Sequence, residues 1–306
     1  MNNALQDVIV SSRVMGRSGP DASAGKVTRR SVEYNLTEHC NLSCYGCDHS
    51  SPLLPKKFAS LEAFSRDLQA LAQVFHSQNL RIVGGEPLLH PQLIDFLTEA
   101  RRIGITDNIV LWTNGVLLHE APDELWEMID RLRISRYPGV KRKLDDEKCA
   151  NICKAHNVHL HIEYIEHFEV IPVNNCMTDT ELVKAIYQDC KSRGEWSCHT
   201  IYEGRFYKCP VAPFTGTRLA LRGVTFDNIP LDGIALHDNP NLYDELYDYL
   251  NDPKPLAACS YCLGSSGPSV PHRQLNHRGR LQWLGEDNGS DIETARAQLS
   301  KKKDAR

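Results

Sequence analysis

The chain has 306 residues, of which 41% are hydrophobic and 24% charged, and its formal net charge is −4. This balance is typical of a folded globular protein and excludes a disordered chain, a fibre or a small disulfide-bonded scaffold. The near-neutral charge gives no overall basic field for nucleic acid or an anionic membrane. No apolar run could span a bilayer and no secretion signal is visible at the N-terminus, so we expect a cytoplasmic protein.

The eleven cysteines are many for a cytoplasmic chain. Their odd number cannot be fully paired, and disulfides rarely persist in that compartment. Clustered cysteines in cytoplasmic proteins more often bind a metal or take part in chemistry. The spacing of the cysteines is therefore the main evidence on function.

The first elements are read from the periodicity of apolar residues. Residues 1–30 lack a sustained pattern, and we expect a loose N-terminal arm there. A strand over 32–36 leads into a loop that contains three cysteines. Apolar residues at three- and four-residue steps then predict a helix over 61–75, with Ser60 as its cap. A short strand over 80–83 follows and ends in Gly-Gly-Glu-Pro.

Further elements alternate along the chain. In order, we expect a helix over 93–103 that stops at Gly104, a strand over 109–112, a helix over 125–132, a strand at Ile134, a helix over 145–156 and a strand over 158–162. The last strand alternates its apolar residues with His159, His161 and Glu163. This polar face lines a cavity if it points inward and is a solvated edge if it points outward. A sixth strand is expected near Val170 and Ile171.

Strands that alternate with helices predict an α/β fold with a parallel sheet. Ligands of such sheets bind at the carboxyl ends of the strands. The cysteine loop, the Gly-Gly-Glu-Pro of 84–87 and the Thr-Asn-Gly of 113–115 each follow a strand, so we expect them on one edge. The alternation stops near residue 185, where we place a domain boundary. Residues 186–285 then form a small cysteine-rich region, and 286–306 a flexible, solvated tail.

The spacing Cys40-x3-Cys44-x2-Cys47 places three thiols on one tight loop. Cysteine thiolate is the preferred ligand of iron–sulfur clusters, and three ligands leave one iron of a cubane open for a small molecule. Zinc normally takes four ligands, which His39 or His49 would complete. A zinc site is therefore the alternative.

Taken together, this loop after a first strand and Gly-Gly-Glu-Pro after a second resemble the radical S-adenosylmethionine (SAM) superfamily. The resemblance implies a partial (β/α)6 TIM-like barrel over 31–185. It implies that Cys40, Cys44 and Cys47 hold a 4Fe–4S cluster whose open iron binds SAM. Reductive cleavage of SAM would then give a 5′-deoxyadenosyl radical, which takes a hydrogen atom from the substrate.

The resemblance also implies contacts with SAM, from Gly84, Gly85, Glu86, Pro87 and Ser135. The two glycines would let the backbone approach the methionine part closely, and the glutamate would accept from its ammonium group. The serine is read equally well as the start of a turn. The family has an aromatic residue directly before its third cysteine, whereas this chain has Gly46 there and Tyr45 one place earlier.

A second set of cysteines resembles the auxiliary-cluster half of the SPASM and Twitch radical SAM enzymes. The resemblance implies a second 4Fe–4S cluster, in the shorter Twitch form, with the ligands Cys190, Cys209, Cys259 and Cys262. Gly204 would allow the hairpin turn that presents the second of these. Cys198 competes for the first position. A structural zinc ribbon and simple buried thiols are the alternatives.

Three cysteines fall outside both sets. Cys149 and Cys153 lie four apart on an expected helix and are read as buried small side chains. Cys176 has no partner at a useful spacing. A free thiol near the site, from Cys176, Cys198 or Cys190, would be able to return a hydrogen atom to a substrate radical.

The resemblance implies a radical SAM oxidoreductase or epimerase that acts on a small polar substrate, with a flavodoxin or ferredoxin as electron donor. A Twitch region on a chain of this length resembles enzymes that oxidise or epimerise sugars and aminocyclitols in natural-product pathways. The alternatives are modification of a ribosomal peptide, by a thioether crosslink or epimerisation, and an iron–sulfur or zinc-binding protein without enzymatic activity. A nucleic-acid-modifying enzyme is not expected, because neither half shows a basic and aromatic stripe.

Overall fold

The structure is a computed structural model that describes residues 25–304. Its main sheet has eight strands in the order β5-β4-β3-β2-β1-β7-β8-β9, and β10 and β6 form a second sheet. The strands are β1 (Val27–Asn35), β2 (Phe75–Val83), β3 (Thr106–Thr113), β4 (Arg131–Arg136), β5 (His159–Tyr164), β6 (His167–Glu169), β7 (His199–Tyr202), β8 (Arg205–Tyr207), β9 (Gly233–Ala235) and β10 (Ser269–Pro271). The helices are α1 (Leu61–Ala72), α2 (Leu93–Ile103), α3 (Glu124–Met128), α4 (Asp146–Ala155), α5 (Thr180–Asp189), α6 (Ala212–Ala220), α7 (Ile229–Asp232), α8 (Leu242–Asn251), α9 (His277–Gly285) and α10 (Gly289–Asp304).

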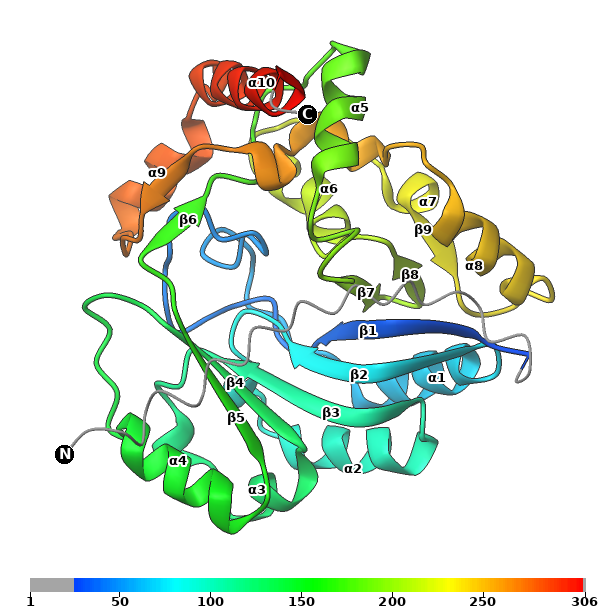
Figure 1. The fold of residues 1–306 in the computed structure, drawn as a ribbon, viewed down its shortest axis with the longest axis vertical. Coiled ribbons are helices and arrows are strands. Elements are labelled where there is room, and N and C mark those ends of the chain that lie inside the picture. The colour runs from blue at the N-terminus through cyan, green and yellow to red at the C-terminus, as the bar shows by residue number, and fades with distance from the viewer. Residues whose placement is uncertain (1–24, 305–306) are drawn as a thin grey trace.

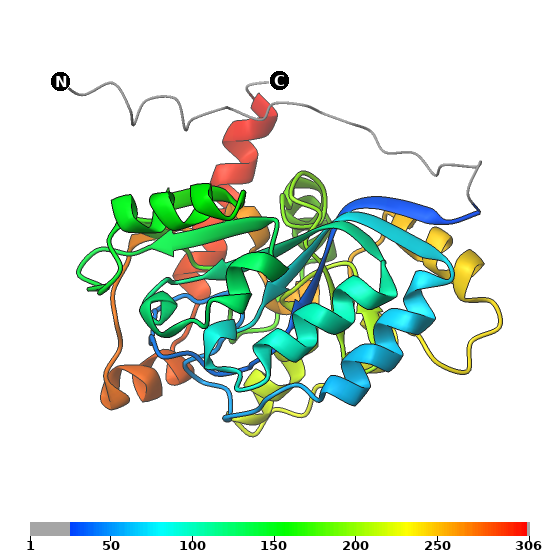
Figure 2. The same ribbon diagram turned by 90° about the horizontal axis from the view of Figure 1, so that it is seen from below.

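The neighbouring strands from β5 to β1 all pair in parallel, and β7 pairs in parallel with the other side of β1. The β8 and β9 strands continue the sheet in antiparallel fashion. Figure 1 shows α1–α4 below the parallel strands, and α5, α6 and α10 above them. Seen from below, α1 and α2 lie next to each other under the sheet (Figure 2). The expected α/β fold with a partial TIM-like barrel is confirmed.

The largest apolar core lies between the parallel strands and α1–α4. Alternate strand residues such as Val32 and Tyr34 pack there against Phe64 and other helix residues. Because side chains alternate along a strand, the residues between them point to the opposite face of the sheet. We call this opposite side the inner face. On β1 it carries Ser31, Glu33 and Asn35.

Local sequence signals fix several element ends. The Ser60 side chain accepts from the backbone N–H of Ala63 over 3.3 Å and caps α1. Gly104 ends α2 with a left-handed φ of 72°, a conformation that glycine adopts at no steric cost. The predicted helix over 61–75 was too long, because Phe75 is already the first residue of β2. The turn between β7 and β8 has positive φ at Glu203 and Gly204, as a tight hairpin requires.

Two expectations about strands and termini were wrong. The sixth strand lies just before Val170, as β6, and it pairs with β10 rather than with the main sheet. The flexible tail over 286–306 is in fact largely the helix α10. Its residues Ala295 and Leu299 are buried in a core shared with α5, so this segment is packed against the protein and is not an exposed tail. Of the loose arm over 1–30, residues 1–24 lie outside the described residues, and 27–30 belong to β1.

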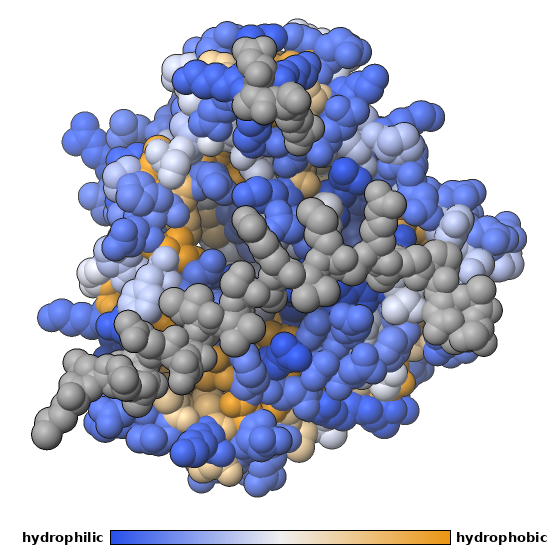
Figure 3. Space-filling model, viewed as in Figure 1, coloured by the Kyte–Doolittle hydropathy of each residue, from blue (hydrophilic) through white to orange (hydrophobic). Residues whose placement is uncertain are grey.

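The surface seen in Figure 3 is mainly hydrophilic, with apolar side chains visible in smaller patches. Within the described residues, no helix has both the length and the apolar character to cross a membrane.

Candidate active site

The three cysteines of the first motif lie in the loop between β1 and α1, at the carboxyl end of β1. Burial is the main reason that their thiol pKa values are raised, to about 12 for Cys40 and about 11 for Cys44. Burial also raises the pKa of Cys47, and the negative charge of Asp48 and then the neighbouring thiols add to the effect. A thiol in such a place becomes a thiolate when a cation compensates its charge, as ligation to iron would do.

In the described part of the chain, no three side chains of His, Cys, Asp or Glu are arranged to hold a single metal ion. The two histidines that we considered as zinc ligands have other partners. His39 Nδ1 lies 3.3 Å from the carbonyl oxygen of Lys57, and His49 Nδ1 lies 3.0 Å from Asp48.

The Gly-Gly-Glu-Pro turn after β2 packs directly on the first residues of the cysteine loop. The backbone N–H of Gly85 donates to the carbonyl of Thr37 over 2.8 Å, and that of Glu86 donates to His39 over 3.1 Å. A Cβ on Gly85 would lie only 2.1 Å from the His39 carbonyl oxygen. Glycine is thus required here by contact between two chain segments, whereas the expected approach to SAM stays a prediction. Pro87 is buried at the start of the short 3-10 helix Pro87–Leu89.

Glu86 is fully buried, and its carboxylate accepts from three donors of the protein. The donors are the Thr113 hydroxyl at 2.7 Å, the Asn114 N–H at 2.9 Å and the Leu88 N–H at 3.1 Å. Burial outweighs these bonds and raises the pKa of Glu86 to about 7. We expected this carboxylate to accept from the ammonium group of SAM. In the structure it joins the turns after β2 and β3, and the contact with SAM stays a prediction.

Asn114, in the Thr-Asn-Gly turn, extends this connection to the cysteine loop. Its side-chain amide donates to Asn41 Oδ1 over 2.7 Å and lies 3.6 Å from Cys40 Sγ. The sequence reading placed this turn at the correct edge but did not select Asn114. A polar residue directly after a strand, next to two other such turns, was the available signal.

Two further residues of the prediction lie near this edge. Ser135 lies at the end of β4, two residues before Tyr137, whose pKa is raised by burial. Tyr45 donates from its hydroxyl to Glu286 over 2.7 Å, and its ring lies 5.5 Å from that of Trp283. Tyr45 therefore contacts α9 and the residue that follows it.

The four cysteines of the second motif are brought together from separate segments. They are Cys190 at the end of α5, Cys209 after β8, Cys259 in a 3-10 helix, and Cys262 directly after it. The pKa of Cys209 is raised by burial first and then by the thiols of Cys262 and Cys190. The amide of Gly264 donates to Cys262 Sγ over 3.3 Å, and a Cβ on Gly264 would lie 3.5 Å from Cys190 Sγ.

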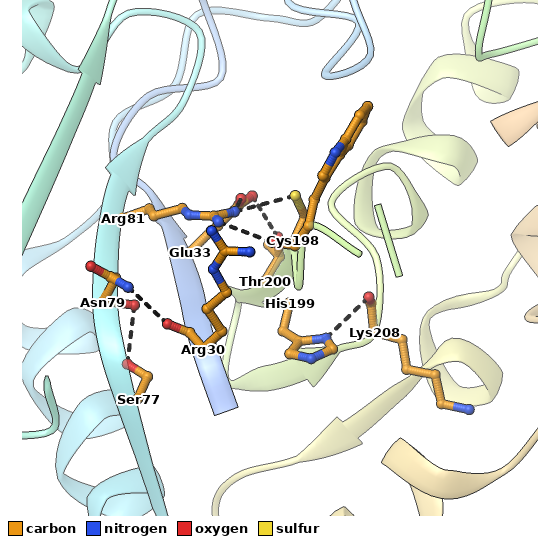
Figure 4. A network of polar contacts seen from close by, with 10 residues as sticks. Arg30, Glu33, Ser77, Asn79, Arg81, Cys198, His199, Thr200 and Lys208 are labelled. Atoms are coloured by element: carbon orange, nitrogen blue, oxygen red, sulfur yellow. Dashed lines mark hydrogen bonds and ion pairs between the residues drawn. The ribbon is translucent and has the colours of Figure 1, made fainter. Parts of the chain in front are cut away.

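Cys198 is placed apart from these four. Arg81 donates to its sulfur over 3.3 Å and to Glu33 over 2.9 Å, so the thiol belongs to a polar network on the inner face (Figure 4). Burial and the nearby Glu33 raise its pKa well above the ordinary value. Cys176 is exposed and lies beside Tyr261. The geometry thus groups Cys190, and not Cys198, with the other three.

The remaining pair, Cys149 and Cys153, is buried in the core on α4, as predicted.

The structure also shows the direction in which the polar face of β5 points. Leu160 and Ile162 pack on the helix side, so His159, His161 and Glu163 point to the inner face.

The inner face is polar, and most of its charges are paired. Arg81 pairs with Glu33, and Arg133 pairs with Glu163. The indole of Trp112 lies within 4.9 Å of the Arg81 guanidinium and 4.2 Å of the Arg133 guanidinium. At the carboxyl end of β1, the Asn35 side chain is only 5% exposed, and its oxygen and nitrogen have no hydrogen-bond partner among the described residues.

Comparison with known proteins agrees with this arrangement. Residues 34–165, which span β1 to β5, match the family model of the radical SAM superfamily. The match covers less than half of the chain, and it shows that this segment is similar to a radical SAM domain. The characteristic cofactors of the superfamily are a 4Fe–4S cluster and SAM.

The similar curated proteins include the GTP 3′,8-cyclase of Rhodopirellula baltica, 28% identical over 145 residues, or 41% of this chain and 40% of that protein. Another is the probable GTP 3′,8-cyclase of Methanopyrus kandleri, 34% identical over 116 residues, or 38% of this chain and 36% of that protein. The chain thus spans about two fifths of the length of these relatives. Among solved structures, BtrN in complex with AdoMet and 2-DOIA covers 77% of this chain and 88% of its own, with a TM-score of 0.47 and 12% identity.

Proposed function

We propose that the protein is a two-cluster radical SAM enzyme that acts on an alcohol carbon of a small polar substrate, a sugar or an aminocyclitol. The reaction is a dehydrogenation or an epimerisation in a natural-product pathway, and a cytoplasmic flavodoxin or ferredoxin supplies the electron. The observation that carries the proposal is the pairing of two cysteine groups in one fold. One group lies at the carboxyl edge of the parallel sheet, and the other is gathered from three segments of the C-terminal half.

The residues present fit the expected cofactors. Cys40, Cys44 and Cys47 offer three thiols on one loop beside the Gly-Gly-Glu-Pro and Thr-Asn-Gly turns, and Cys190, Cys209, Cys259 and Cys262 offer four. When bound, the first cluster with SAM supplies a 5′-deoxyadenosyl radical that abstracts a hydrogen atom, and the second supplies an acceptor for one electron. Each group has one buried cysteine, Cys44 or Cys262, and its other cysteines are partly buried, which limits the access of water.

The inner face supports a polar substrate of low net charge. Its two Arg–Glu pairs compensate each other, so the charge on either side of Trp112 is locally balanced. Asn35 adds a buried amide that can both donate to and accept from a substrate hydroxyl. Because unpartnered buried polar groups are costly, a ligand that satisfies this amide would bind favourably.

The choice between dehydrogenation and epimerisation depends on Cys198. Its raised pKa keeps the thiol protonated, and its place on the inner face would allow it to return a hydrogen atom to a substrate radical. If the reaction is an epimerisation in D₂O, the product should carry solvent deuterium through the exchangeable thiol. Cys198→Ser should then abolish product formation but still allow SAM cleavage, whereas a dehydrogenase would tolerate the change.

The test of the proposal is anaerobic reconstitution followed by a substrate screen. The wild type should bind about eight irons. It should release 5′-deoxyadenosine faster with an aminocyclitol or sugar alcohol than without substrate. GTP, the substrate in the name of the relatives above, and a panel of short peptides serve as comparison substrates. If GTP or a peptide stimulated SAM cleavage and no sugar or aminocyclitol did, the sugar or aminocyclitol assignment would be refuted. Zinc in place of iron would refute the whole proposal.

A further inference from the structure

A segment from the far end of the chain runs antiparallel along the cysteine loop. We call residues 272–275 the crossing segment. The backbone N–H of Tyr45 donates to the carbonyl of Arg273 over 3.0 Å, and that of Leu275 donates to the carbonyl of Ser43 over 2.7 Å. Cys44 and Gln274 face each other in this short bridge. No motif or spacing in the sequence indicates a function for these residues.

Two side chains of the crossing segment reach the sulfur of Cys44. Gln274 Nε2 lies 3.1 Å and His272 Nε2 lies 3.3 Å from Cys44 Sγ. Both residues are on the same side of the segment, as alternation along an extended chain requires. The His272 ring is held in place by stacking on Tyr137, with centroids 4.7 Å apart and planes 16° apart.

The orientation of the Gln274 amide is fixed by a second contact. The backbone N–H of Ser43 donates to Gln274 Oε1 over 2.7 Å, so the oxygen of the amide is already in use. The NH₂ group must therefore face Cys44, because only the amide nitrogen can donate. Its other proton points toward His272 Nε2, at 3.0 Å. Gln274 is thus a donor aimed at one sulfur of the loop.

A donor in this position has a defined effect on an iron–sulfur cluster. Hydrogen bonds to the ligating sulfurs are one of the factors that set the reduction potential. The reduced cluster carries one more negative charge than the oxidised cluster, so a donated proton stabilises the reduced form more. Cys40 receives its donors from the nearby Leu42 and from Asn114, whereas the side-chain donor to Cys44, Gln274, comes from the C-terminal part of the chain.

We propose that Gln274 is a positioning residue for the SAM-binding cluster. Its side chain donates a hydrogen bond to the Cys44 thiolate, and this bond raises the reduction potential of the cluster and fixes the crossing segment on the loop. The proposal rests on the proposed function, since it requires a cluster on Cys40, Cys44 and Cys47. It adds a contribution of the C-terminal region to the first cluster, beyond the ligands of the second.

The test is a redox titration monitored by electron paramagnetic resonance, applied to the signal that changes when SAM is added. Gln274→Leu removes the donor, and Gln78→Leu makes the same chemical change at an exposed position of β2. We expect reduction of the Q274L cluster to be about tenfold less favourable, a shift of about 59 mV to lower potential for one electron. The potential of Q78L should equal that of the wild type.

A second variant, Gln274→Glu, retains an acceptor for the Ser43 N–H but has no proton to donate. It should also lower the potential, and it stands in for Q274L if that variant folds poorly. Loss of the SAM-responsive cluster from Q274L but not from Q78L would also support the contact. Equal iron content and equal potential in Q274L, Q274E and Q78L would overturn the inference. A wild type without any SAM-responsive signal would instead refute the proposed function.

Discussion

The two groups of cysteines are assembled by different means. Cys40, Cys44 and Cys47 belong to one loop, whose position follows from the end of β1 and from the turns after β2 and β3. Cys190, Cys209, Cys259 and Cys262 come from α5, a hairpin and a 3-10 helix, and they meet only through tertiary packing. A local motif therefore suffices to identify the first group, whereas the membership of the second requires the fold.

The largest expected effect comes from removing the loop group alone. A Cys40/Cys44/Cys47→Ala variant should lose all cleavage of SAM and fall from about eight irons to about four, because only the C-terminal group remains. Iron and sulfide analysis after anaerobic reconstitution measures this. If the variant held no iron at all, the C-terminal cysteines would be structural or bind zinc, and the two-cluster comparison would fail.

The membership of the C-terminal group is tested by a matched pair of single substitutions. Cys262→Ser should lose about four irons, because it removes one of four ligands. Cys198→Ser should keep all of them, because that sulfur contacts Arg81 on the inner face. If Cys198→Ser lost iron and Cys262→Ser kept it, Cys198 would be a ligand, and the grouping of the four cysteines in the structure would not describe the metal site.

Glu86 joins the turns that pack on the loop of Cys40, Cys44 and Cys47, and its contribution is tested through the pH dependence of the protein's stability. The pKa of Glu86 is raised from 4.5 to about 7, so the folded protein binds more protons than the unfolded chain between these values. The free energy of unfolding attributable to Glu86 should therefore fall as pH rises through this window, by at most about 3 kcal/mol.

Urea unfolding of the wild type and of Glu86→Gln at several pH values measures this difference. Glutamine has no charge to bury, so the variant should lack that part of the pH slope. Parallel slopes for the two proteins would show that the carboxylate is ionised with its ordinary pKa, held by the donors from Thr113, Asn114 and Leu88.

The smallest expected effect concerns the packing behind the C-terminal group. Leu299 of α10 is buried against the core of α5, and Cys190 caps the end of α5. Leu299→Ala should therefore cost about 2–3 kcal/mol of unfolding free energy. Lys301→Ala, at an exposed position of the same helix, should change it by less than about 0.5 kcal/mol. Equal stabilities would mean that α10 does not support this region.

Much of the fold follows from local patterns. The order of strands and helices, the Ser60 cap, the Gly104 stop and the hairpin at Gly204 were predicted correctly, because each depends on a few neighbouring residues. The helix expected over 125–132 was too long, because α3 ends at Met128 and Leu132 already lies in β4. The sixth strand was assigned wrongly because the pairing partner of β6 is β10, about a hundred residues away. The helix α10 was missed because a strongly charged sequence, with Lys301 and its two neighbours, obscured a short apolar stripe.

The candidate site shows the same limit. Its cysteines and the Gly-Gly-Glu-Pro turn have recognisable spacings, so their convergence on one edge was predictable. Asn114 and Gln274 have no such signal, because their significance lies in contacts with Asn41 and Cys44 that only the folded chain creates. Spacing alone could not decide whether Cys190 or Cys198 is the first ligand of the C-terminal group, since both cysteines precede the hairpin.

The pairing of β7 with β1 has a consequence for any attempt to divide the protein near residue 185. Without β7, residues Val32–Tyr34 would become the exposed margin of the sheet, with backbone donors and acceptors left open for another chain. The isolated N-terminal fragment should therefore self-associate through β1, although it contains the whole cysteine loop. The C-terminal half thus also covers this edge of the parallel sheet.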